Sequence, residues 1–161
     1  MNDIATAGVV DPTEGEAWWF LGTLAIIRID GAQTAGRFAI IEFLLPKDAS
    51  PPLHAHPQDE TFMLLDGRMT IWIAGQPWSC TPGSIAFAPG GVGHSFIVDS
   101  DNARVLTLST PSGIEEMVRG LGQRASERRL PDDEEAPYPP TEKIEAVFAA
   151  CGIKELGPPP G

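Results

Sequence analysis

The chain has 161 residues, enough for one domain with its own hydrophobic core. There are 22 acidic and 11 basic residues, a formal net charge of −11, and no basic stripe, which argues against nucleic acid or an anionic membrane as a partner. No apolar run approaches the ~20 residues that span a bilayer. The start of the chain lacks the basic and apolar stretches of a signal peptide, so a cytoplasmic location is expected.

Short apolar runs follow the aromatic cluster Trp18-Trp19-Phe20. They are rich in Ile, Phe, Val and Trp, and turn signals such as DG, TPG and APGG separate them. The predicted strands are residues 21–29, 38–45, 61–65, 69–73, 85–88, 94–98 and 104–109. Short strands at this spacing predict an all-β sandwich or barrel.

The pattern changes after Pro111, where Ser112 can begin a helix and a charged, proline-rich connector over residues 128–140 follows. Thr141 can cap a last helix that Gly152 ends, and this helix is expected to dock on the outside of the barrel or on a second subunit. The predicted organisation is an N-terminal segment (1–20), a barrel (21–112) and a C-terminal helical extension with a disordered tail (113–161).

Side chains able to bind a metal gather in the segment HAHPQDETFMLLDG, from His54 to Gly67. Residues two apart on a strand share a face, so His54 and His56 point the same way. Pro57 cannot donate to a sheet ladder, and the chain is expected to bend there and bring Glu60 back beside the imidazoles. Gly67 then supplies a tight turn.

The remaining histidine, His94, lies in a second segment, GSIAFAPGGVGHSFIV, over residues 83–98. One histidine in a strand is more often structural than a ligand, but here all three histidines of the chain fall into one two-part pattern. Three imidazoles and a carboxylate are costly to bury unpaired, and one divalent metal ion satisfies all four. We therefore predict a metal site formed by His54, His56, Glu60 and His94.

The two segments resemble the motifs of the cupin superfamily, G-x5-H-x-H-x3,4-E-x6-G and G-x5-P-x-G-x2-H-x3-N. The matching residues are His54, His56, Glu60 and Gly67 in the first motif and Gly83, Pro89, Gly91 and His94 in the second. Asp48 replaces the first glycine, and Val98 replaces the last asparagine. The opening WFLGTLAIIRIDGAQTAGRFAIIEFLLP and the closing helix are similar to bacterial single-domain cupins of the quercetin 2,3-dioxygenase-like group.

This resemblance implies a double-stranded β-helix, or jelly-roll barrel, with C-terminal helices. It also implies a metal-dependent enzyme, a dioxygenase acting on a flavonol-like or other phenolic, enolisable small molecule. A non-oxidative enzyme (a polyketide cyclase or isomerase) that uses the metal as a Lewis acid, and a non-catalytic small-molecule binder, stay open as alternatives. The ligand set does not select among Fe, Mn, Ni, Cu and Zn. Glu60 is either a fourth ligand or a general base, and the second role requires a raised pKa.

Inward positions of the predicted strands are apolar. The substrate pocket is predicted to consist of Phe38, Phe62, Leu64, Met69, Trp72, Phe87, Phe96 and Val98. Such walls suit a flat aromatic or polyketide-like substrate, although the same side chains could simply fill a small barrel. A homodimer is expected, and the Trp18-Trp19-Phe20 cluster is either its contact or a cover for the end of the barrel itself.

Overall fold

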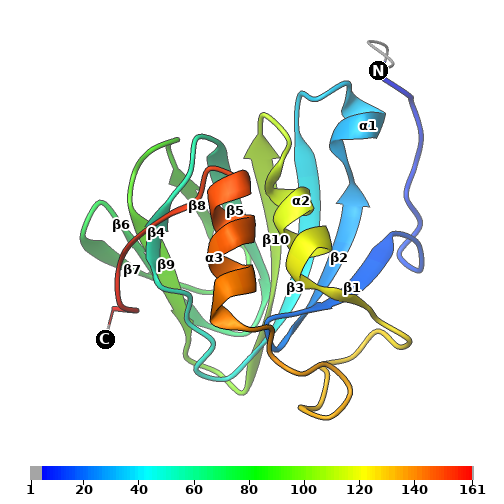
Figure 1. Ribbon diagram of the computed structural model, residues 1–161. Helices are drawn as coiled ribbons and strands as arrows, with labels where there is room; N and C mark the ends of the chain where they lie inside the picture. Colours follow the sequence, from blue (N-terminus) through cyan, green and yellow to red (C-terminus); the bar gives the residue numbers. More distant parts are fainter. Residues whose placement is uncertain (1–4, 161) are drawn as a thin grey trace.

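The computed structural model describes residues 5–160 and shows two antiparallel β-sheets that form a barrel, with helices α2 and α3 on one side of it (Figure 1). The all-β jelly-roll barrel with C-terminal helices is therefore confirmed. Within residues 5–160, no helix has both the length and the apolar character needed to cross a membrane.

The seven-stranded sheet contains, in spatial order, β11 (Gln123–Arg124), β1 (Glu16–Phe20), β2 (Thr23–Ile29), β3 (Ala39–Pro46), β10 (Asn102–Thr110), β5 (Asp59–Asp66) and β8 (Ile85–Ala88). The five-stranded sheet contains β12 (Lys154–Gly157), β4 (Leu53–Ala55), β9 (His94–Val98), β6 (Met69–Ile73) and β7 (Gln76–Cys80). The helices are α1 (Gly31–Thr34), α2 (Ile114–Leu121) and α3 (Thr141–Ala150).

The predicted strands correspond to β2, β3, β5, β6, β8, β9 and β10, and β6, β8 and β9 have the predicted bounds. The sheets include strands from both ends of the chain, outside residues 21–112. Strand β1 pairs along its length with β2, although the sequence pattern assigns it to the N-terminal segment 1–20. Strand β12 pairs with β4, although it falls in the C-terminal extension 113–161. Gly157 ends β12, so the expected disordered tail begins after it at the earliest, and Gly161 lies outside the described residues.

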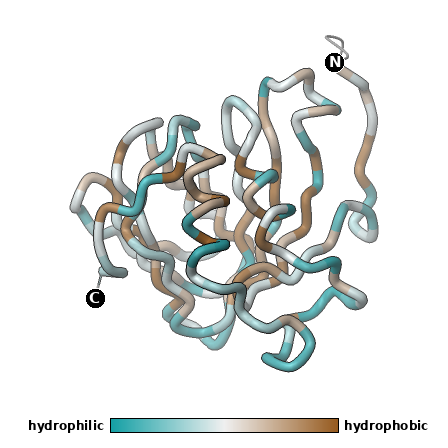
Figure 2. The backbone as a smooth tube through the Cα atoms, in the orientation of Figure 1, coloured by the Kyte–Doolittle hydropathy of each residue, from teal (hydrophilic) through white to brown (hydrophobic). Residues whose placement is uncertain are grey.

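The hydrophobic interior has two parts on the inner side of the sheets. One fills the barrel between β5, β6, β9 and β10, with Leu64, Met69, Ile71, Val98 and Val105 almost fully buried. In the other, α2 and α3 cover the part of the seven-stranded sheet that β1, β2 and β3 form. Figure 2 shows hydrophobic residues along the strands and a largely hydrophilic connector between α2 and α3.

The aromatic cluster Trp18-Trp19-Phe20 packs within the chain. Phe20 is buried beneath α2, and Trp19 is buried on the opposite face of the sheet, where its Nε1–H donates to the Arg129 carbonyl at 3.0 Å. Residues 19 and 20 are thus used inside the chain and are not available for a dimer contact. Helix α3 packs against α2 on the side of the barrel (Figure 1) and contributes Phe148 to the same interior.

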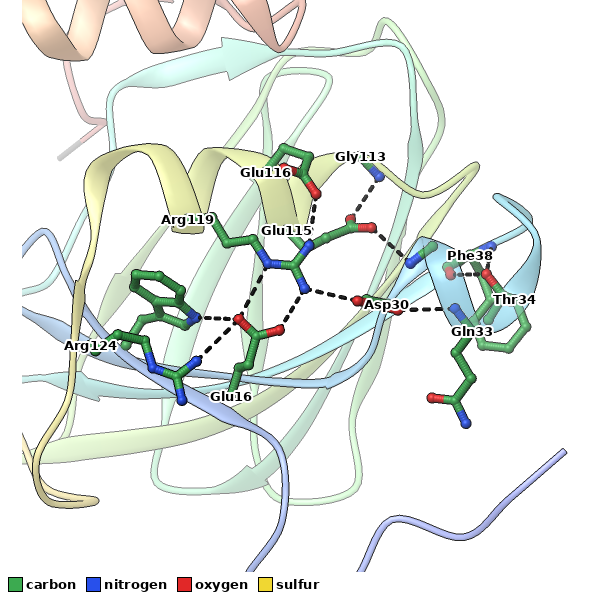
Figure 3. Close-up of polar contacts among 12 residues, drawn as sticks. Glu16, Asp30, Gln33, Thr34, Phe38, Gly113, Glu115, Glu116, Arg119 and Arg124 are labelled. Atoms are coloured by element: carbon green, nitrogen blue, oxygen red, sulfur yellow. Dashed lines mark hydrogen bonds and ion pairs between the residues drawn. The ribbon is translucent and has the colours of Figure 1, made fainter. Parts of the chain in front are cut away.

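Helix α2 is tied to the sheet by polar contacts at its first two turns (Figure 3). The buried Glu115 carboxylate accepts the backbone N–H of Gly31 at 2.9 Å and that of Gly113 at 2.7 Å. Arg119 donates to Glu16 on β1 at 2.6 Å and to Asp30, before α1, at 2.8 Å. These bonds fix the position of α2 over the sheet, and with it the position of the side chains that α2 turns inward.

Gly67 occupies the turn between β5 and β6 and has a φ of +88°. A Cβ atom there would clash with the carbonyl oxygen of Asn102, so both the backbone conformation and the space require glycine. Gly75 has a similar φ of +78°, but nothing lies within 4 Å of its Cβ position.

We expect Gly67→Ala to lower the free energy of unfolding by at least about 3 kcal/mol, since strain and overlap add. Gly75→Ala, the matched control, should cost about 1 kcal/mol from φ strain alone. Urea denaturation of both variants measures the difference. Equal losses in the two variants would show that the contact with Asn102 is unimportant.

Candidate metal centre and cavity

Three histidine rings converge between the two sheets. His54 on β4 lies directly opposite His94 on β9, and His56 follows the end of β4. Ring centroids are 4.5 Å apart for His54 and His94, 4.9 Å for His56 and His94, and 5.8 Å for His54 and His56. One nitrogen from each ring lies within 4.8 Å of the others, so the three histidines could hold a metal ion.

Glu60 approaches the histidines from the other sheet. It is the second residue of β5, and its side chain is buried. Its Oε2 lies 3.0 Å from Nε2 of His56 and 3.2 Å from Nε2 of His94. The sequence predicts that Glu60 returns to the imidazoles after the bend at Pro57, and its carboxylate lies in that position.

Backbone carbonyls fix which nitrogen of each ring carries the hydrogen. Nδ1 lies 2.7 Å from the Pro52 carbonyl in His54, 3.1 Å from the Gln58 carbonyl in His56, and 2.9 Å from the Val92 carbonyl in His94. A carbonyl oxygen can only accept, so Nδ1–H must be the donor in every ring, and a neutral ring then has a lone pair on Nε2.

This tautomer leaves electron pairs facing one another. Nε2 of His56 and of His94 and the Glu60 carboxylate are all acceptors, yet they lie at hydrogen-bond distance. Such an arrangement is repulsive unless a proton on one of the rings or a metal cation lies among the atoms. A divalent metal ion fits this donor set, because it binds neutral imidazole nitrogen and carboxylate oxygen while carbonyls hold the other ring nitrogens.

The glycine-rich turn before β9 is bonded to the histidine segment. The Gly91 N–H donates to the His56 carbonyl at 2.8 Å, and the Gly90 N–H donates to Asp59 at 2.7 Å. A Cβ atom on Gly90 would clash with the Pro57 carbonyl, so the two segments approach too closely for any other residue. These contacts explain why a glycine turn and a proline bend occur together around the histidines.

Glu60 and His54 have the ionisation states that metal ligands need. Burial acts to raise the pKa of Glu60, but the contacts with His56 and His94 outweigh it and lower the pKa to about 2. Burial lowers the pKa of His54 to about 4, which keeps that ring neutral at neutral pH. Burial also acts to lower the pKa of His94, but its contact with Glu60 prevails and raises it. The raised pKa that a general-base role for Glu60 requires is thus not found, and the carboxylate is ionised.

A cavity of about 360 Å³ adjoins the histidines and Glu60, within the ~300–1,000 Å³ range of small-molecule sites. Its walls are mostly apolar and come from both sheets and from the C-terminal helices; they include Phe20, Phe43, Phe62, Phe96, Ile114, Met117, Phe148 and Ile153. Among the lining residues of the described chain, Glu60 is the one acidic side chain, and there is no lysine or arginine.

The predicted pocket residues divide according to their depth in the barrel. Phe62 and Phe96 line the cavity as predicted. Leu64, Met69 and Val98 also face inward, but they pack in the barrel core and do not line the cavity. These three pack in the core because a barrel of this size fills its interior with side chains beyond the site.

The other predicted pocket residues lie away from the cavity lining. Trp72 alternates with the buried Ile71 and Ile73 on β6 and therefore faces outward. Phe87 on β8 is 55% exposed. Phe38 precedes β3, and its backbone is hydrogen bonded to the Thr34 hydroxyl beside α1 (Figure 3).

Several lining residues were not predicted from the sequence. Phe20 comes from the N-terminal segment, and Tyr138, Phe148 and Ile153 come from the C-terminal extension. The apolar face of the last helix indicated that this helix packs against something. A local pattern of this kind does not show which part of the protein the face packs against. Nothing in the sequence pattern indicated that Ser50, in the loop before β4, lines the cavity.

Part of the chain is similar in sequence to known proteins. Residues 41–110 match the family described as Cupin domain. The chain is 34% identical over 98 residues to quercetin 2,3-dioxygenase of Bacillus subtilis, which covers 59% of this chain and 29% of that protein. The chain therefore matches less than a third of that relative's length. An uncharacterized protein of Streptomyces coelicolor is 28% identical over 95 residues, covering 52% of this chain and 90% of that protein.

Solved structures show the same fold. The polyketide cyclase RemF from Streptomyces resistomycificus aligns over 88% of this chain and 99% of its own length, with a TM-score of 0.57 and 22% sequence identity. At that identity the likeness concerns the fold alone. The family match, the barrel topology and the two motifs around the histidines identify residues 41–110 as a cupin domain.

Proposed function

We propose that the chain is a metal-dependent dioxygenase that acts on a flavonol-like or other phenolic, enolisable small molecule. The observation that carries the proposal is the meeting of imidazole lone pairs and the Glu60 carboxylate beside an apolar cavity without lysine or arginine. The 34% identity to part of a quercetin 2,3-dioxygenase supports the oxygen-consuming reaction.

His54, His56, His94 and Glu60 would hold one divalent ion, with each imidazole presenting Nε2. A redox-active ion in this place would supply the activation of O₂ or of the bound substrate that the side chains cannot provide. The chain's own contribution is to fix the ligand rings through the carbonyls of Pro52, Gln58 and Val92.

Charge balance favours a substrate with one ionisable hydroxyl. Three neutral imidazoles and one carboxylate leave a divalent ion with one positive charge in excess. In an apolar cavity, this excess favours a ligand with one negative charge on oxygen, and a phenol or enol provides it by losing one proton. The lining offers no lysine or arginine to pair with a phosphate or an additional carboxylate.

Aromatic side chains beside the ligands suit a flat substrate. The Phe62 ring centroid lies 6.0 Å from that of His94 at an interplanar angle of 66°, so one wall next to the histidines is aromatic. Phe43 and Phe96 add further ring surface to the cavity, with the Phe20 ring 6.4 Å from Phe43. Such walls exclude water and pack against planar rings.

We expect the purified protein to hold about one divalent metal ion per chain. His94→Ala should weaken the affinity for Mn²⁺ at least about 100-fold, because a direct ligand is lost and ligand-supporting residues alone account for 10–100-fold. Elemental analysis and metal titration measure both quantities. Ser79→Ala, on the exposed edge strand β7, is the control and should keep the wild-type metal content. Wild-type metal content in the His94→Ala variant would contradict the ligand assignment.

We expect protein loaded with a redox-active ion to consume O₂ in proportion to added quercetin, and a chelator to abolish the uptake. His56→Ala should lower kcat/KM at least about 100-fold, a loss of about 2.7 kcal/mol of transition-state stabilisation. An oxygen electrode and product analysis measure the reaction. Turnover of an enolisable polyketide under strict anaerobiosis with zinc bound would instead establish the non-oxidative alternative. Flavonol binding that survives loss of both the metal and Glu60 would favour a non-catalytic binder.

A further inference from the structure

Two threonine hydroxyls in the cavity wall already have a hydrogen-bond partner. The Thr23 hydroxyl donates to the Phe20 carbonyl at 2.6 Å, and the Thr107 hydroxyl donates to the Ile41 carbonyl at 3.3 Å. Ser50 also lines the cavity, and its Oγ atom is buried. Within residues 5–160, this oxygen has no hydrogen-bond partner, which distinguishes it from the two threonines.

The backbone on both sides of Ser50 is held in place. The Ala49 carbonyl accepts the Val98 N–H at 3.1 Å, and the Pro51 carbonyl accepts the Ser95 hydroxyl at 2.6 Å. Two prolines follow Ser50, and the carbonyl of the second accepts the His54 ring. The serine backbone therefore belongs to the same fixed segment as the first histidine.

Ser50 lies between two contacts with β9. Its neighbour Ala49 bonds to Val98, and its other neighbour Pro51 bonds to Ser95, the residue after His94. The cavity beside the histidines thus also has, in its lining, a residue with a buried, unpaired hydroxyl.

We propose that Ser50 is a substrate-positioning residue whose hydroxyl bonds to a second oxygen of the substrate. This inference rests on the proposed function and narrows its substrate class. The substrate is a flat molecule with an ionisable hydroxyl for the histidine site and, apart from it, a neutral hydroxyl or carbonyl for Ser50. A buried hydroxyl without a partner costs folding stability, so its bond is completed by the ligand and not by the fold.

Ligand binding under strict anaerobiosis tests this inference without turnover. Quercetin and 3-hydroxyflavone share the 3-hydroxy-4-ketone unit, but quercetin carries further hydroxyl groups at its far ends. In metal-loaded protein, Ser50→Ala should weaken quercetin binding about 5- to 10-fold, as expected for one hydrogen bond, and change 3-hydroxyflavone binding less than about twofold. The melting temperature should not fall. Ser79→Ala should change neither affinity.

Three outcomes would overturn the inference. These are unchanged quercetin affinity in Ser50→Ala, an equal loss for both flavonols, and failure of wild-type protein to bind either one. A lower melting temperature with unchanged binding would show that Ser50 serves the fold, for instance through an ordered water molecule. If the selective loss occurs but wild-type protein consumes no O₂, the dioxygenase proposal fails and the role of Ser50 in binding stands.

Discussion

Each of the three histidine rings gives its Nδ1–H to a backbone carbonyl two residues along the chain. Those carbonyls lie in three separate loop segments, so the ring orientations depend on loops as well as on strands. The loop before β4 is bonded to β9 by Ser95 and Pro51, and the loop before β9 is bonded to His56 by Gly91. The approach of the three rings to one another, and of His56 and His94 to Glu60, is therefore set by backbone geometry before any ligand binds, as a preorganised metal site requires.

The cavity beside these ligands depends on parts of the chain beyond the histidine strands. Helix α2 presents Ile114 and Met117 to it, and α3 presents Phe148. The position of α2 depends on the buried Glu115 and on Arg119, which bond it to the sheet and to the turn before α1 (Figure 3). The C-terminal extension is thus part of the site, because it closes a side of the cavity that the sheets leave open.

Spacing and strand parity predicted the convergence of the three histidines and Glu60, and part of the cavity lining. Phe62 and Phe96 follow from counting in twos from Glu60 and His94, since residues two apart share a face. The same counting gives Leu64 and Val98, which face inward but lie in the packed core. Parity specifies a face and not a depth along the barrel. Phe148 could not be predicted to line the cavity because its helix packs through tertiary contacts that no local pattern encodes.

The two departures from the cupin motifs have separate physical explanations. Asp48 replaces a glycine and has a φ of +63°, so the position keeps its left-handed conformation, which aspartate tolerates better than most residues. Val98 replaces an asparagine and is fully buried in the barrel core, where a polar side chain would need a partner. Neither change touches the histidines, and both leave the loop before β4 in place.

The distribution of charge separates the surface from the site. The chain carries a net charge of −11, and arginines at positions such as 104, 119 and 129 are paired with carboxylates. The cavity lining has no lysine or arginine. An anionic substrate would meet repulsion outside and find no counter-charge beyond a metal ion inside. The proposed neutral phenol would avoid both costs, because its single negative charge would develop only beside the histidines, where a divalent ion held by Glu60 would keep one uncompensated positive charge.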